Sequence, residues 1–176
     1  MTHHLPPPPP PLPAPPAMPE DIRTARQLWW GVAGLAVVQL FASIPAMLGQ
    51  RDELAKQLFE QMQSRDPAFT LEQADRLIPV AFVFAGLLAL TIAGLVVLFA
   101  HFMARGKLWG RTLLTVAGVW LLLNTLGALV TIGSVSGVGS LLGGGASIVQ
   151  GVLGGGAIYL MHRKESTAYF LAHRRR

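Results

Sequence analysis

Four long apolar stretches alternate with short polar segments along this chain. They cover residues of about 28–48, 78–102, 113–132 and 138–161, and no Asp, Glu, Lys or Arg interrupts any of them. Each is near or above the ~20 residues that an α-helix needs to cross the hydrocarbon core of a bilayer. The pattern predicts an all-α membrane protein whose four transmembrane helices form an antiparallel bundle.

The outer loop, residues 49–77, carries a second and weaker periodicity. Apolar residues recur there at helical spacing: Leu54, Ala55, Leu58, Phe59 and Met62. This predicts a short amphipathic helix over about Asp52 to Ser64, whose apolar face is covered by the outer leaflet, by the top of the bundle or by a partner. Thr70 followed by Gln73 fits a capping box, so the next helix should begin near Leu71 and run into the second span.

The segments outside the bundle differ in composition from it. Residues 1–22 hold a run of prolines that predicts a disordered, cytoplasmic polyproline II tail, either a passive spacer or a ligand for aromatic-lined grooves. Residues 23–163 form the transmembrane domain. Residues 164–176 form a basic cytoplasmic tail suited to an anionic lipid surface.

Basic residues are distributed unequally between the two sides of the bundle. Ten of the 14 Lys and Arg residues fall on the side of the termini and of the loop between spans two and three. By the positive-inside rule this predicts a multi-pass plasma-membrane protein with both termini in the cytoplasm. Trp29, Trp30 and Trp109 fall on the same side, as interfacial anchors do. The inner loop supplies the predicted inner-face anchors Arg105, Lys107, Trp109 and Arg111.

The first apolar stretch has one competing interpretation. Ala42, Ser43 and Ala46 follow an apolar run, as in a secretory signal peptide. The long proline-rich segment before it and a run of about 21 mostly apolar residues favour a membrane span instead.

Small residues recur every four positions in two of the spans. The predicted helix-packing residues are Gly139, Gly143, Ser147, Gly151 and Gly155 in the fourth span, a glycine zipper, and Ala81, Ala85, Ala89 and Ala93 in the second. Small side chains let membrane helices approach closely. We expect the fourth span to pack on the second; a seam between copies or with another protein, and a glycine-lined pore, are the alternatives.

Polar chemistry inside the spans is sparse. Asn124 and Gln150 are the strongest polar groups near mid-span, and we expect them to bond between helices, with each other or with a substrate. The chain has no Cys, no intramembrane carboxylate and no phosphate-binding or catalytic motif. The sequence therefore predicts no enzyme activity, no cofactor and no metal site, although His101 and His162 fall at neighbouring span ends.

Overall composition agrees with this class. The chain is 52% hydrophobic and 13% charged, with a mean hydropathy of +0.47. Its net charge of +5 indicates contact with anionic lipid rather than with nucleic acid.

Two short segments carry a resemblance. The inner loop Ala104-Arg105-Gly106-Lys107-Leu108-Trp109-Gly110-Arg111 and the ending Glu165-Ser166-Thr167-Ala168-Tyr169-Phe170 resemble those of small, mostly uncharacterised actinobacterial four-span membrane proteins with a proline-rich cytoplasmic N-terminal tail. The resemblance implies a bacterial plasma membrane and brings no activity.

The expected function follows from the packing devices and the missing site chemistry. We expect an accessory or scaffold subunit of a membrane or envelope complex, contacting the lipid bilayer and a protein partner through the tail or the glycine stripe. A homo-oligomer, and with it a small oligomeric channel or carrier, is the alternative.

Overall fold

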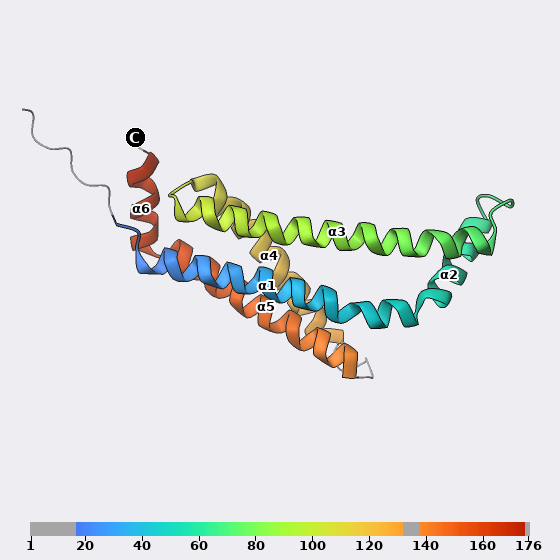
Figure 1. The fold of residues 1–176 in the computed structure, drawn as a ribbon. Coiled ribbons are helices and arrows are strands. Elements are labelled where there is room, and N and C mark those ends of the chain that lie inside the picture. The colour runs from blue at the N-terminus through green and yellow to red at the C-terminus, as the bar shows by residue number, and fades with distance from the viewer. Residues whose placement is uncertain (1–16, 132–137, 175–176) are drawn as a thin grey trace, which may run out of the picture.

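The computed structural model describes residues 17–131 and 138–174, with only the backbone described for 131, 138–142 and 174. The described residues form six helices: α1 (Glu20–Gly49), α2 (Arg51–Gln63), α3 (Leu71–Ala104), α4 (Leu108–Thr131), α5 (Val138–His162) and α6 (Lys164–Arg174). Four of them, α1, α3, α4 and α5, are long and apolar enough to cross a membrane. Successive long helices run in opposite directions (Figure 1). The predicted fold class is confirmed.

The order of the helices differs from the sequence-based expectation. α5 packs against α1 and α4, while α3 packs against α1, α4 and α2. The expected packing of the fourth span on the second is therefore wrong. Figure 1 shows the reason, because α3 and α5 both end near one another beside α6 but lie further apart toward the residues at which they begin.

The helices converge at one end of the bundle, which we call the basic end because it carries Arg23, Arg26, Arg105 and Lys107. The largest cluster of buried side chains lies here, and it draws on α1, α3, α4, α5 and α6: Ile22, Ala25, Trp29, Val32, Ala100, Met103, Ala104, Leu114, Ala157, Met161, Tyr169 and Phe170. Small side chains on α3 and α5 leave room for the aromatic rings of α1 and α6. The core of the molecule is thus concentrated at this end.

The segment predicted as a basic tail forms α6 over most of its length. Tyr169 and Phe170 are buried in the core, so this helix closes the basic end of the bundle. The Tyr169 hydroxyl donates to the carbonyl oxygen of Ala104 at 3.1 Å, which ties α6 to the end of α3. At the α5–α6 elbow, Arg163 forms an ion pair with Asp21 of α1 at 2.8 Å.

The opposite end of the bundle carries the predicted amphipathic helix, which is confirmed as α2. Its apolar face packs on the first turns of α3 through Ala55, Ala74 and Ile78. The capping box at Thr70 and Gln73 is present, so α3 begins at Leu71 as predicted. At ~1.5 Å per residue the 34 residues of α3 are longer than the ~30 Å hydrocarbon core of a bilayer, so part of this helix extends beyond that core.

The fold generates a first prediction, which concerns α6. Phe170→Ala removes a fully buried ring from the core and should lower the free energy of unfolding by about 3–5 kcal/mol. The measurement is the thermal unfolding of the full chain in detergent micelles, followed by circular dichroism. The matched control is Leu171→Ala, because Leu171 is 49% exposed. Equal losses from the two variants would contradict the role of α6 as part of the core.

Candidate functional site

A close contact between spans lies where α5 crosses α4. A Cβ added to Gly151 would collide with the side chain of Thr125, so only glycine fits at this point. The Thr125 hydroxyl donates to the Ser147 carbonyl of α5 at 3.0 Å and lies 2.9 Å from the Leu121 carbonyl of its own helix. This contact combines close packing with an interhelical hydrogen bond, the two interactions that hold helices together in lipid.

A second close contact lies nearer the basic end. A Cβ at Gly118 of α4 would collide with Ile158 of α5 and would come within 3.2 Å of the Trp29 ring of α1. Trp29 is fully buried, so its predicted role as an interfacial anchor is wrong. It occupies the α1 face that points into the bundle, whereas Trp30, one residue on, is exposed. Sequence reasoning missed Gly118 and Thr125, although their seven-residue spacing places both on one face of α4.

The predicted small-residue stripe of α5 is only partly used in these contacts. Ser147, Gly151 and Gly155 face α4, and a Cβ at Gly155 would lie 3.4 Å from Leu122. A Cβ at Gly143 would meet nothing within 4 Å, and the surroundings of Gly139 lie outside the described residues. The alanine stripe of α3 divides similarly. Its last member, Ala93, is buried, and the others are exposed: Ala81, Ala85 and Ala89.

The two mid-span amides lie on different helices and do not meet. Gln150 is buried, and its amide nitrogen donates to the Val32 carbonyl of α1 at 3.2 Å. Asn124 is exposed on the surface of α4, and its amide nitrogen donates one turn back to the Trp120 carbonyl at 2.8 Å. Gln150 therefore links two helices of the bundle, while Asn124 presents an amide to the surroundings of the bundle.

The outward face of α4 is apolar on either side of Asn124. Its members recur with alternating steps of three and four residues: Leu113, Val116, Trp120, Leu123, Gly127 and Val130. Val116 is 63% exposed and Trp120 68% exposed. Alternating steps of three and four are the spacing of the seam along which two helices form a left-handed coiled coil.

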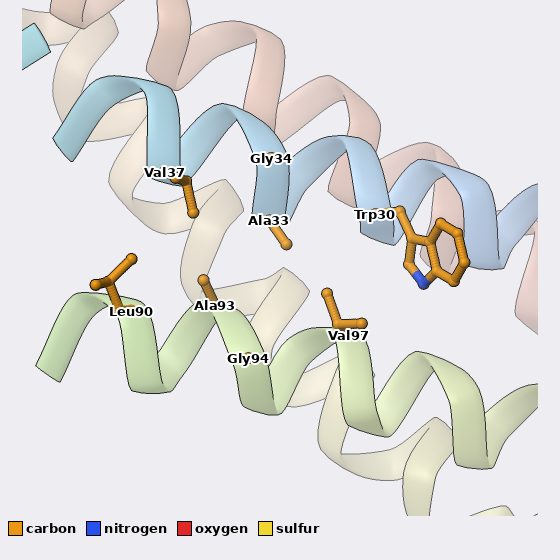
Figure 2. A pocket seen from close by; sticks show the side chains of 8 residues that line it. All are labelled: Trp30, Ala33, Gly34, Val37, Leu90, Ala93, Gly94 and Val97. Carbon is orange, nitrogen blue, oxygen red and sulfur yellow. The ribbon is translucent and has the colours of Figure 1, made fainter. Parts of the chain in front are cut away.

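A groove of about 530 Å³ runs between α1 and α3 (Figure 2). Its lining residues come equally from the two helices: Trp30, Ala33, Gly34, Val37, Leu90, Ala93, Gly94 and Val97. A Cβ added to Gly34 or Gly94 would meet nothing within 4 Å. Small residues here leave the seam open, in contrast to their effect between α4 and α5. A second hollow of about 330 Å³ shares Leu90 and continues toward the α2 end.

The predicted inner-face anchors surround the basic end. Arg105 and Lys107 are exposed beside the turn between α3 and α4. The Trp109 ring packs edge-on against Phe99 with 5.7 Å between centroids. Arg111 reaches instead toward α6, where its guanidinium lies 5.3 Å from the centre of the Phe170 ring and 3.4 Å from the Thr167 hydroxyl. Arg111 thus supports the core of the basic end.

Burial also shifts the pKa of the one tyrosine of α6. It raises the pKa of the Tyr169 phenol above its ordinary value of 10.0, because the charged phenolate is poorly solvated in the core. The phenol therefore stays protonated at neutral pH and donates to Ala104.

Among residues 17–131 and 138–174, no three His, Asp or Glu side chains gather into a set that could hold a metal ion. Comparisons with protein-family models, curated proteins and solved structures find no match. The arrangement thus offers two surfaces, the outward face of α4 and the α1–α3 groove.

The α4–α5 contact generates a second prediction. Gly151→Ala should lower the free energy of unfolding by about 1–3 kcal/mol, because the added methyl group collides with Thr125. The matched control is Gly143→Ala in the same stripe, which has open space and should leave stability unchanged or slightly higher. Thermal unfolding in detergent compares the two. Equal destabilisation by the two variants would contradict the assigned contact between Gly151 and Thr125.

A third prediction concerns pH. Folding raises the pKa of Tyr169. The stabilising contribution of the protonated phenol is therefore complete below pH ~10 and is lost as the pH rises through the raised pKa. The unfolding midpoint should therefore fall at alkaline pH, and Tyr169→Phe should flatten this fall. Tyr159→Phe serves as the control, since it removes a phenol that is 70% exposed in place of the buried one. Identical profiles for all three proteins would contradict the assignment.

Proposed function

We propose that this chain is a non-enzymatic integral membrane protein that acts as an accessory or scaffold subunit of a larger membrane or envelope complex. The helix that meets the partner is α4. The observation that carries the proposal is the Asn124 amide, which lies on the outer surface of the bundle within a membrane span.

An exposed amide is costly at this depth of a bilayer. Lipid tails offer no hydrogen bonds, so a polar group facing them loses the partners that it has in water. The bond from Asn124 to the Trp120 carbonyl uses the amide nitrogen and does not involve the side-chain oxygen. A helix from a partner that donates to this oxygen would relieve the cost, with a gain of about 1 kcal/mol.

The apolar face around Asn124 has the shape that a partner helix needs. Its alternating three- and four-residue spacing continues for most of α4, and large side chains such as Trp120 stand out from the surface. Knobs of this kind fit between the side chains of a facing helix. The glycines at 151 and 155 are engaged inside the chain, so α4 replaces the glycine stripe as the proposed partner surface.

The polar groups of the spans favour a scaffold over the alternative of a channel or carrier. Thr125 and Gln150 bond to backbone carbonyls of neighbouring helices, and Thr91 bonds to a carbonyl of its own helix. The Thr125 and Gln150 side chains therefore hold helices together, which is a packing use of polar groups and not the lining of a pore.

The proposed setting is the plasma membrane, with the basic end and both termini on the cytoplasmic side. The unequal distribution of Lys and Arg supports this orientation. The proline-rich segment 1–22 lies mostly outside the described residues and stays a predicted spacer or partner ligand. The resemblance to actinobacterial four-span proteins likewise stays a prediction.

The proposal predicts a defined companion that depends on Asn124. Native mass spectrometry of the full chain, extracted gently from its own membrane, should show stoichiometric foreign subunits. Asn124→Leu should lower their retention about fivefold, because it removes an interhelical hydrogen bond of about 1 kcal/mol while keeping the size of the side chain.

The matched control for this experiment is Thr91→Val on α3. It also removes an exposed polar group from a span, but the Thr91 hydroxyl is already bonded to the Leu87 carbonyl at 2.8 Å, so companions should be retained. Companions that survive Asn124→Leu unchanged would contradict the proposed surface. A chain recovered alone, or only with copies of itself, would contradict the accessory role.

A further inference from the structure

We propose that the α1–α3 groove is a binding site for one anionic phospholipid, with an acyl chain between the two helices and the headgroup at the basic end. This inference is independent of the partner surface on α4. It rests on the apolar groove and on the charges that continue from both of its walls.

The groove has the size and lining of an acyl-chain site. Its eight lining residues are apolar, and its volume of about 530 Å³ is within the ~300–1,000 Å³ typical of ligand pockets. From Trp30 to Leu40, where the second hollow begins, α1 rises about 15 Å at ~1.5 Å per residue. This is half of the ~30 Å hydrocarbon core and therefore the depth of one leaflet.

The wall formed by α1 continues into basic residues at the basic end. Arg26 lies one turn before Trp30, and its guanidinium sits 5.6 Å from the centre of the Trp30 ring. Arg23 lies seven residues before Trp30, so both arginines share the helix face that lines the groove. A Trp ring with an adjacent arginine is typical of the level at which lipid headgroups meet acyl chains.

The wall formed by α3 continues in the same way. His101 lies one turn after the lining residue Val97, and Arg105 lies one turn further on, so all three share one face. His101 and Arg105 are exposed. The mouth of the groove is thus flanked by basic side chains from both helices.

The charges at this mouth are not neutralised within the described part of the chain. Its ion pairs involve Arg51, Arg76 and Arg163, while Arg23, Arg26 and Arg105 form none there. Each basic residue near a membrane surface strengthens the binding of an anionic lipid by about fivefold. An uncharged or zwitterionic lipid would fill the same groove without using these charges, so charge complementarity selects an anionic headgroup.

The test measures retained lipid directly. The full chain is equilibrated in detergent micelles with equal amounts of phosphatidylglycerol and phosphatidylcholine, and native mass spectrometry counts the lipids that stay bound. We expect one tightly held phosphatidylglycerol per chain, retained at least fivefold more often than phosphatidylcholine. Equal retention of the two lipids, or none of either, would overturn the proposal.

Two variants test separately the contribution of the apolar groove and that of the basic residues at its mouth. Arg26→Gln should reduce the preference for phosphatidylglycerol about fivefold while leaving total lipid retention largely unchanged. Gly94→Leu should reduce retention of both lipids, because the new side chain occupies open space in the groove. Matched controls are Lys56→Gln on α2 and Ala89→Leu, an exposed site of α3 outside the groove lining, and both should behave as the unmodified chain.

Folding and the source of the anionic group are checked in the same series. Circular dichroism spectra and unfolding midpoints must match the unmodified chain before retention is compared, and Gly34→Leu offers a second variant that fills the groove. Inorganic phosphate in excess should not release the lipid, because the acyl chain contributes to binding. Release by phosphate, a preference for phosphatidylglycerol that Arg26→Gln leaves unchanged, or loss of that preference in the Lys56→Gln control would overturn the assignment.

Discussion

The close approach of α5 to α4 is the contact on which the rest of the bundle depends. In lipid, apolar side chains gain little by leaving one hydrocarbon surface for another, so helices associate where their backbones pack closely and where buried polar groups find partners. Gly118 and Gly151 meet the first condition, and the Thr125 hydroxyl meets the second by bonding to α5. α5 then carries Gln150 to the α1 backbone, so a single crossing brings three helices together.

The two ends of the bundle differ because this crossing does not include α3. At the basic end, α3 is held by the shared core, to which α6 adds Phe170 and Tyr169. Toward the other end α3 diverges from α5, and there α2 packs on its first turns (Figure 1). The groove lies between α3 and α1, with small residues on both helices. Gly34 and Gly94 lie beside open space. The glycines between α4 and α5, in contrast, mark a tight contact.

The elements of the fold could be predicted from sequence more fully than their arrangement. Length and hydropathy located four spans, and the Thr70 capping box located the start of α3, because these signals are local. A stripe of small residues shows that a face can pack closely but carries no information on which helix it meets. Burial differs even between the neighbours Trp29 and Trp30, since one residue rotates a helical side chain by about 100°. The basic charge of residues 164–176 likewise indicated a tail at the lipid surface, and it gave no sign that two aromatic residues of this segment make α6 part of the core.

Gln150 and Asn124 carry the same side-chain amide within membrane spans, but the two amides face different surroundings. Both are amides within spans, and hydropathy treats them alike. Gln150 faces α1 and is satisfied inside the chain. Asn124 is the immediate neighbour of Thr125, so α4 turns one polar residue toward α5 and the next toward its surroundings. A partner bound at Asn124 would therefore rest on the helix whose Thr125 packs against Gly151 of α5.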